Sequence, residues 1–153
     1  MAKEVREESV GDVYDTIVGE PARVAKGALV RDAIAALVEN PCSQSVYVVG
    51  KGRRLLGAIT TATLLRQMGY RLGSRKVGII PFFRFLSEVF DEKVESFMDE
   101  AHGVRRETPL TDALKTMTDF KLDNLPVVDD KGVLVGELNG VEMLKEGLRL
   151  WKD

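Results

Sequence analysis

The sequence contains the same pattern twice: an apolar strand, a glycine and the start of an amphipathic helix. The first copy is LLGAITTATLLRQM (55–68) and the second is LVGELNGVEMLKEG (134–147). Upstream of each copy lies a helix-like segment, LVRDAIAALVEN (29–40) and PLTDALKTMTDF (109–120), and these two align at an offset of 80 residues. Self-similarity at a fixed spacing predicts two related structural units rather than one irregular domain.

The strand-like segments between these elements align as well. The offset of 80 pairs SVYVVGKG (45–52) with LPVVDDKG (125–132). One extra residue in the first copy after the turn then aligns Gly57 with Gly136. The order of elements is therefore expected to be the same in both halves.

Each copy is predicted to form strand, helix, strand, turn, strand and helix. Apolar residues recur at helical spacing in 29–40 and 109–120, and Thr108 followed by Pro109 is typical of a helix N-cap with proline at the first helical position. The β-branched runs 46–49 and 126–128 end in Gly-rich or Asp-rich turns, which predicts β-hairpins.

One β-α-β-β-α unit of this size would leave a sheet face poorly covered, so two units are expected to pack together. The predicted fold class is α/β of the α+β type, with two such repeats about a pseudo-twofold axis and two related clefts between them. The expected boundaries are 1–68 for the first repeat, 69–93 for an inserted helix and 94–153 for the second repeat.

The ordered set of motifs resembles the CBS domain, named after cystathionine β-synthase. It includes L-V-R-D-A (29–33) and G-A-I-T-T-A-T-L-L (57–65) in the first copy, and P-L-T-D-A-L-K-T-M (109–117), N-L-P-V-V-D (124–129) and G-E-L-N-G-V-E-M-L (136–144) in the second. The chain resembles a stand-alone tandem CBS pair, often called a Bateman module.

The resemblance implies that clefts between the repeats bind an adenosyl compound such as AMP, ADP, ATP or S-adenosylmethionine. The family's usual Thr/Ser-x-x-Asp at the strand–helix junction implies a hydroxyl near phosphate and a carboxylate near ribose. This chain departs from that pattern in both copies, with Thr60 and Thr63 in the first and Asn139 and Glu142 in the second. The cleft served by Glu142 is therefore expected to be the tighter ribose site, because a carboxylate accepts hydrogen bonds more strongly than a hydroxyl.

The resemblance also implies further contacts to the ligand. Four residues fall where the family surrounds adenine: Val46, Tyr47, Leu125 and Pro126. Four more follow the first strand that lines the cleft: Arg23, Val24, Val104 and Arg105. Each has a simpler interpretation, since the apolar residues suit a strand core, the arginines suit a surface, and Thr60 and Glu142 suit a helix start. These alternatives stay open at this point.

Composition limits the other function classes. The chain has 153 residues, 44% hydrophobic and 30% charged, with a net charge of −2. This charge argues against general nucleic-acid binding, including through the basic stretch 66–84.

We expect no signal peptide and no membrane span, and therefore a cytoplasmic protein. Cys42, the only cysteine, is expected to be a partly buried apolar residue. No metal-ligand spacing and no nucleophile with a base are present, so we expect neither a metal site nor an enzyme.

The leading hypothesis is thus a non-enzymatic regulatory module that acts on a separate effector protein. The alternative is a ligand-free dimerisation or scaffold module that uses the basic, aromatic insert, where a Gly-Ser-Arg-Lys loop (73–76) precedes IIPFFRFLSEVF (79–90). A homodimer is expected in either case. Its predicted interface is a set of apolar helix residues: Leu64, Leu65, Met68, Val141, Leu144 and Leu148.

Overall fold

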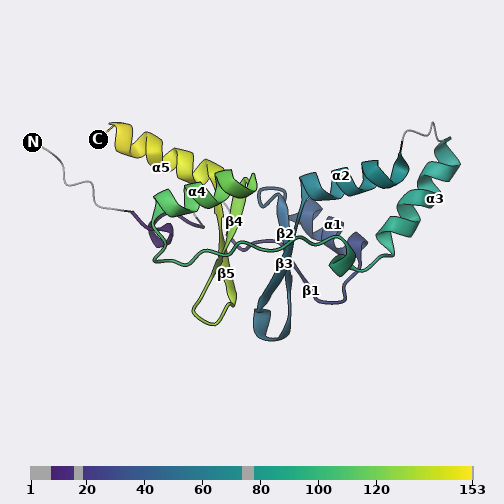
Figure 1. Ribbon diagram of the computed structural model, residues 1–153, viewed down its shortest axis with the longest axis horizontal. Coiled ribbons are helices and arrows are strands. Elements are labelled where there is room, and N and C mark those ends of the chain that lie inside the picture. Colours follow the sequence, from purple (N-terminus) through teal and green to yellow (C-terminus); the bar gives the residue numbers. More distant parts are fainter. Residues whose placement is uncertain (1–7, 16–18, 74–77, 153) are drawn as a thin grey trace, which may run out of the picture. The chain divides into compact units, whose positions relative to one another are not determined.

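The computed structural model describes residues 8–15, 19–73 and 78–152 (Figure 1). Its helices and strands follow the order predicted from the repeat, apart from the first strand of the second copy. The elements are η1 (Val10–Asp12), β1 (Arg23–Ala25), α1 (Val30–Glu39), β2 (Ser45–Val49), η2 (Lys51–Arg53), β3 (Leu55–Thr60), α2 (Thr61–Leu72), α3 (Ile79–Phe90), η3 (Val94–Ser96), α4 (Leu110–Phe120), β4 (Asn124–Val128), β5 (Leu134–Asn139) and α5 (Gly140–Lys152). The fold is mixed α and β, as expected.

The chain divides into two compact units, each with its own hydrophobic core. The first-repeat unit comprises residues 22–101, and the second-repeat unit comprises residues 1–21 together with 102–153. Val30, Val46 and Ile59 are fully buried in the first core. Val10, Leu125 and Leu138 are fully buried in the second. Val10 belongs to the N-terminal segment, so the second-repeat unit is built from two separate parts of the chain.

Both predicted hairpins are present, and they share one register. In the first, Val48 pairs with Gly57 and Val49 with Leu55, so the ladder slips between Val48 and Val49. In the second, Val127 pairs with Gly136, and the same slip follows it. The two hairpins are thus equivalent at an offset of 79 along their whole length.

This register corrects the sequence alignment by one position. Ser45 pairs with Thr60 as Asn124 pairs with Asn139, so Ser45 is equivalent to Asn124 and not to Leu125. The extra residue of the first copy therefore lies before β2, in the loop after α1, and not after the hairpin turn. A shift of one residue moves each strand side chain to the opposite face, so the correction decides which residues are equivalent.

The first strand of the two repeats differs in length. In the first-repeat unit β1 pairs in parallel with β2, with Arg23 opposite Tyr47. In the second-repeat unit the predicted strand is reduced to a single parallel bridge between Val104 and Val127. The first sheet therefore has three strands and the second has two among the described residues.

Two local predictions need correction. α4 begins at Leu110 with Pro109 as N-cap, and the Thr108 hydroxyl accepts a hydrogen bond from the Arg105 backbone N–H instead of capping the helix. Cys42 is exposed rather than partly buried, because it lies in the surface loop between α1 and β2. Of the predicted basic loop, residues 74–76 lie outside the described residues.

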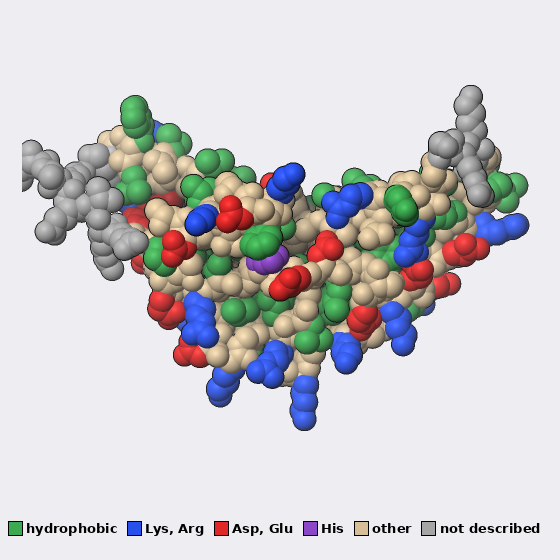
Figure 2. All heavy atoms as spheres, viewed as in Figure 1, with side chains coloured by type: hydrophobic (Ala, Val, Ile, Leu, Met, Phe, Trp, Pro, Cys, Tyr) green, Lys and Arg blue, Asp and Glu red, His purple; other side chains and the backbone are tan. Residues whose placement is uncertain are grey.

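The helices of the described segments are short. None of them has both the length and the apolar character that crossing a bilayer requires. Figure 2 shows blue Lys and Arg side chains projecting from the hairpin tips; at the β2–β3 tip, the exposed residues Lys51, Arg53 and Arg54 supply such charge.

Candidate functional site

The junction between β3 and α2 carries a directed chain of hydrogen bonds. Thr60 caps α2, and its Oγ1 accepts from the Thr63 backbone N–H at 3.0 Å. The Thr60 hydroxyl donates to Oγ1 of Thr63 at 2.9 Å, and the Thr63 hydroxyl donates to Oδ2 of Asp99 at 2.8 Å. Since each threonine has a single hydroxyl proton, both protons point along this chain toward Asp99. Thr60 and Thr63 are thus in direct contact at the start of α2.

Asp99 reaches this junction from a different part of the sequence. It lies just after η3 and forms an antiparallel bridge with Ala58, in which each backbone N–H donates to the other residue's carbonyl, at 2.9 and 3.1 Å. Gly57 makes this approach possible, because a β-carbon there would stand 2.7 Å from Sδ of Met98 and 3.0 Å from the Asp99 carbonyl oxygen. Asp99 itself is exposed. Because Gly57 has no side chain, a second segment of the chain can pack against β3 at this position.

The equivalent junction between β5 and α5 is closed by reciprocal caps. Oδ1 of Asn139 accepts from the Val141 N–H at 2.7 Å, while Oε1 of Glu142 accepts from the Asn139 N–H at 2.8 Å. Glu142 is 1% exposed. Such a pair satisfies donors that a helix start leaves without helical partners. The Glu142 carboxylate is therefore buried and not solvated, and its helix-start role is observed.

Asp15 occupies the position in the second-repeat unit that Asp99 occupies in the first. Its backbone N–H donates to the Glu137 carbonyl at 3.4 Å, and its Oδ1 accepts from the Glu137 N–H at 3.3 Å. A β-carbon on Gly136 would lie 2.8 Å from its Oδ2. Partial burial raises the pKa of Asp15, and the charge of Glu142 acts in the same direction.

Neither aspartate was among the residues selected from sequence. The signal was present, because V-G-D-V-Y-D (10–15) and V-E-S-F-M-D (94–99) share a Val, an apolar pair and a final Asp. Their offset is 84, however, whereas the later elements repeat at 79 or 80. The two segments therefore fall out of register with the rest of the repeat, and an alignment at fixed offset passes over them.

The residues predicted to surround adenine lie in the strands. Val46 and Leu125 are 0% exposed and belong to the two hydrophobic cores, while Tyr47 is 1% exposed and Pro126 is buried. Tyr47 and Pro126 are equivalent, since they pair with Ala58 and Glu137, the residues that the aspartate segments contact. The core interpretation therefore holds for Val46 and Leu125.

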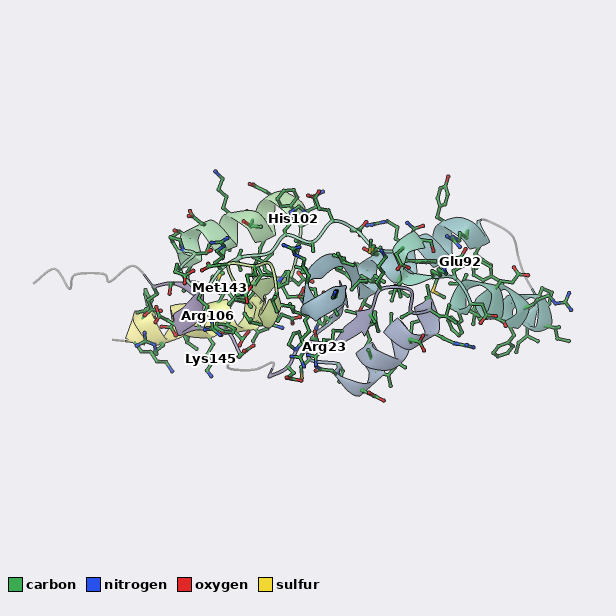
Figure 3. All side chains as sticks on the ribbon, turned by 90° about the horizontal axis from the view of Figure 1, so that it is seen from below. Arg23, Glu92, His102, Arg106, Met143 and Lys145 are labelled. Atoms are coloured by element: carbon green, nitrogen blue, oxygen red, sulfur yellow. The ribbon has the colours of Figure 1, made fainter. Side chains whose placement is uncertain are left out.

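The residues of the first strands are spread over different environments. Val24 is half-buried against the first core, and Val104 is 6% exposed in the second. Arg23 is half-buried on β1 (Figure 3). Arg105 is exposed, and its Nη1 lies 3.0 Å from Oδ1 of Asp130 in the β4–β5 turn. Surface ion pairs of this kind contribute little to stability, so Arg105 can exchange this partner for another anion.

Arg106, the neighbour of Arg105, holds the N-terminal segment. Its Nε donates to the Tyr14 hydroxyl at 2.8 Å, and its guanidinium carbon lies 5.7 Å from the Tyr14 ring centre (Figure 3). Gly11 also donates its N–H to the Arg106 carbonyl at 2.8 Å. These contacts fix the segment that ends in Asp15.

Of the six residues predicted to form the dimer interface, four are exposed, one is half-buried and one is buried. Leu65, Val141, Leu144 and Leu148 are 65%, 58%, 75% and 56% exposed. Leu64 is 5% exposed and belongs to the first core, so including it in a surface was wrong. Between α1 and α2, Leu65 and Met68 line an apolar groove of about 410 Å³.

No cluster of three or more His, Cys, Asp and Glu side chains arranged to hold a metal ion occurs in residues 8–15, 19–73 and 78–152. The two junctions contribute hydroxyl, amide and carboxylate groups. Such groups recognise hydroxyls and N–H groups of a ligand.

The family model for the CBS domain matches residues 94–146, the second repeat. Over 97% of each chain, the structure also resembles a CBS domain-containing protein of Thermotoga maritima, with 28% sequence identity and a TM-score of 0.74. The chain thus contains a CBS domain in its second repeat. The family model does not extend over residues 22–93, which hold most of the first-repeat unit.

Two further CBS structures contain ligands. The CBS-pair protein CBSX2 of Arabidopsis thaliana, solved in complex with AMP, is 26% identical over 94% of this chain and 98% of its own, with a TM-score of 0.71. The CBS domain pair of protein MJ0100, solved with 5′-methylthioadenosine and S-adenosyl-L-methionine, is 16% identical over 95% and 98%, with a TM-score of 0.68, and shows the fold alone. Among curated proteins, no sequence matches.

Proposed function

We propose that this CBS-domain protein is a non-enzymatic, cytoplasmic regulatory module that binds an adenosyl compound and signals its presence to a separate effector protein. The observation that carries the proposal is the pair of strand–glycine–helix junctions. Each brings a carboxylate from another segment, Asp99 or Asp15, against the strand after the glycine. Similarity to CBSX2, which was solved with AMP, supports an adenosyl ligand.

The junction residues suit the sugar of such a ligand. Hydrogen bonds to a charged acceptor contribute about 1.5–3 kcal/mol each, and a carboxylate accepts from both ribose hydroxyls at once. Thr60, Thr63, Asn139 and Glu142 remain the candidate contacts at the helix starts. Tyr47 and Pro126, with Val24 and Val104, are the candidates for the base, while Arg23 and Arg105 are the candidates for phosphate.

Calorimetric titration of the whole chain with AMP, ADP, ATP and S-adenosylmethionine tests this function. We expect saturable heat with at least one of them, and a higher melting temperature in its presence, because a ligand that binds only the folded state stabilises it. Absence of both heat and thermal shift with all four compounds would contradict the proposal.

A second candidate function, dimerisation or scaffolding without a nucleotide, is favoured by exposed apolar residues on the insert. Ile79, Ile80 and Phe83 of α3 are 71%, 70% and 62% exposed. Phe85 and Phe90 instead pack against the first core and anchor the helix. If Phe83→Ser and Ile80→Ser abolished self-association or effector capture while adenosyl compounds produced no heat, the scaffold function would replace the regulatory one.

A further inference from the structure

The ribose-binding carboxylate of the first repeat is missing from the position where the family pattern has it. Thr63 stands there and is 3% exposed. Its hydroxyl proton is donated to Asp99, and its oxygen accepts from Thr60. Thr63 therefore has no hydroxyl proton to offer a ligand and little surface on which to meet one.

The hydrogen-bond chain ends in an acceptor. Because the protons of Thr60 and Thr63 both point toward Asp99, the outermost group of the chain is a carboxylate. Oδ2 of Asp99 accepts from Thr63, whereas within the described ranges no hydrogen bond reaches Oδ1. A phosphate needs donors, and a sugar hydroxyl needs an acceptor. This end of the junction is thus suited to hydroxyls and not to phosphate.

Asp99 is also held in position. Two backbone hydrogen bonds join it to Ala58, and the Thr63 hydroxyl fixes one carboxylate oxygen. The residue remains exposed, so a ligand reaches it without breaking the core. Preorganised acceptors of this kind lose little conformational freedom on binding.

The carboxylates of the second-repeat junction are bonded to backbone N–H groups. Oε1 of Glu142 already accepts from the Asn139 N–H, and the side chain is 1% exposed. Oδ1 of Asp15 accepts from the Glu137 N–H, and the charge of Glu142 disfavours ionisation of Asp15. One oxygen of each of these two carboxylates therefore accepts from a backbone N–H of the same unit.

We infer that Asp99, carried by the segment that precedes the second repeat, supplies the ribose carboxylate of the first repeat in place of Thr63. This inference rests on the proposed function. It reverses the order expected from sequence, since the Thr60–Thr63 junction becomes the stronger ribose site and the Glu142 junction the weaker. The ligand class is a compound with a free ribose diol.

The test compares two ligands across variants of the whole chain. Adenosine and 2′,3′-dideoxyadenosine are titrated into wild type, Asp99→Asn and Glu100→Gln. Asp99→Asn keeps an oxygen that accepts from the Thr63 hydroxyl but removes the charge. Adenosine affinity is therefore expected to fall about ten- to a hundredfold. The affinity for 2′,3′-dideoxyadenosine is expected to be the same in Asp99→Asn as in wild type. Glu100→Gln removes the neighbouring exposed charge and is expected to bind adenosine like wild type.

A charge-relocation variant separates recognition from folding. In Thr63→Asp/Asp99→Asn the carboxylate returns to the helix, and adenosine affinity is expected to recover relative to Asp99→Asn alone. Equal weakening of both ligands by Asp99→Asn, or unchanged adenosine binding, would overturn the inference while leaving the proposed function intact. Wild type that binds neither adenosine nor any adenosyl nucleotide would instead overturn the proposed function.

Discussion

Gly136 and Tyr14 lie so close together that a β-carbon on the glycine would stand 2.5 Å from Cε2 of the tyrosine ring. The N-terminal segment therefore packs directly on the backbone of β5. Any side chain at position 136 has to displace an aromatic ring whose hydroxyl accepts a hydrogen bond from Arg106.

Gly136→Ala is expected to destabilise the protein by about 1–3 kcal/mol, because the added methyl overpacks this contact. Urea unfolding measures the change. Gly69→Ala is the matched control, since a β-carbon there meets nothing within 4 Å in α2, and it is expected to stabilise by about 0.5–1 kcal/mol. Equal stability of Gly136→Ala and wild type would show that the N-terminal segment does not pack there in solution.

Asp15 gives a pH-dependent prediction. Partial burial raises the pKa of Asp15, so the folded state binds its proton more tightly than the unfolded state does. Its contribution to stability is therefore present below the ordinary Asp range and is lost as pH rises through the raised value. Asp15→Asn keeps an acceptor for the Glu137 N–H and tolerates the φ of 62°, so it is expected to raise the melting temperature at pH 7.

The melting-temperature difference between Asp15→Asn and wild type is expected to vanish as the pH falls and Asp15 becomes protonated. Asp129 is the opposite case, because hydrogen bonds from the Val133 and Lys131 backbone N–H groups lower its pKa. Asp129→Asn is therefore expected to lower the melting temperature at pH 7, with the difference shrinking as pH falls through the lowered value. A gain for Asp15→Asn that is constant from pH 3 to 8 would contradict the charge explanation.

Glu142→Ala separates capping from ligand binding. The substitution leaves the Asn139 N–H without the acceptor that it now has, which is expected to cost about 1–3 kcal/mol of stability. Adenosine affinity at the first-repeat junction is expected to stay within about twofold of wild type. Thermal unfolding and calorimetry measure the two effects, and a tenfold or larger loss of adenosine affinity in a folded variant would return Glu142 to the main ribose site.

The exposed stripe of α5 predicts the oligomeric state. Val141, Leu144 and Leu148 recur at helical spacing and are more than half exposed, which is typical of a helix face that a second copy covers. We expect a homodimer in light scattering and a monomer for Leu144→Glu, with Lys145→Gln as the control that changes the net charge by the same amount. A wild-type monomer at all concentrations would exclude this surface as a dimer contact.

Local spacing predicted much of the fold. The two hairpins and the alignment of Gly57 with Gly136 followed from β-branched runs that end in turns. The offset assigned to the first strands of the hairpins was wrong by one residue, because two apolar strands align nearly as well when one of them is shifted by one position. Only hydrogen-bonded register decides between such alignments.

The site was predicted less completely for a different reason. Thr60 and Thr63 were selected because they stand at the two polar positions of the Thr/Ser-x-x-Asp pattern that the resemblance to the CBS domain implies. Asp99 lies 36 positions from Thr63, and its role depends on a backbone bridge that no local pattern encodes. The burial of Glu142 was equally hidden, since a carboxylate at a helix start is compatible with either solvent or a cap.

The divided second-repeat unit bears on how the chain folds as it is synthesised. Residues 22–101 contain every part of the first-repeat unit, so that unit is complete before His102 is added. The N-terminal segment, by contrast, cannot form its contacts until residues such as Glu137 have been synthesised. Glu137 lies 122 positions after Asp15. Closing such a long loop is slow, and Val10 and Val13 stay without their core until β5 has emerged from the ribosome. The segment that carries Val10 and Val13 is therefore synthesised before the first-repeat unit but folds after it.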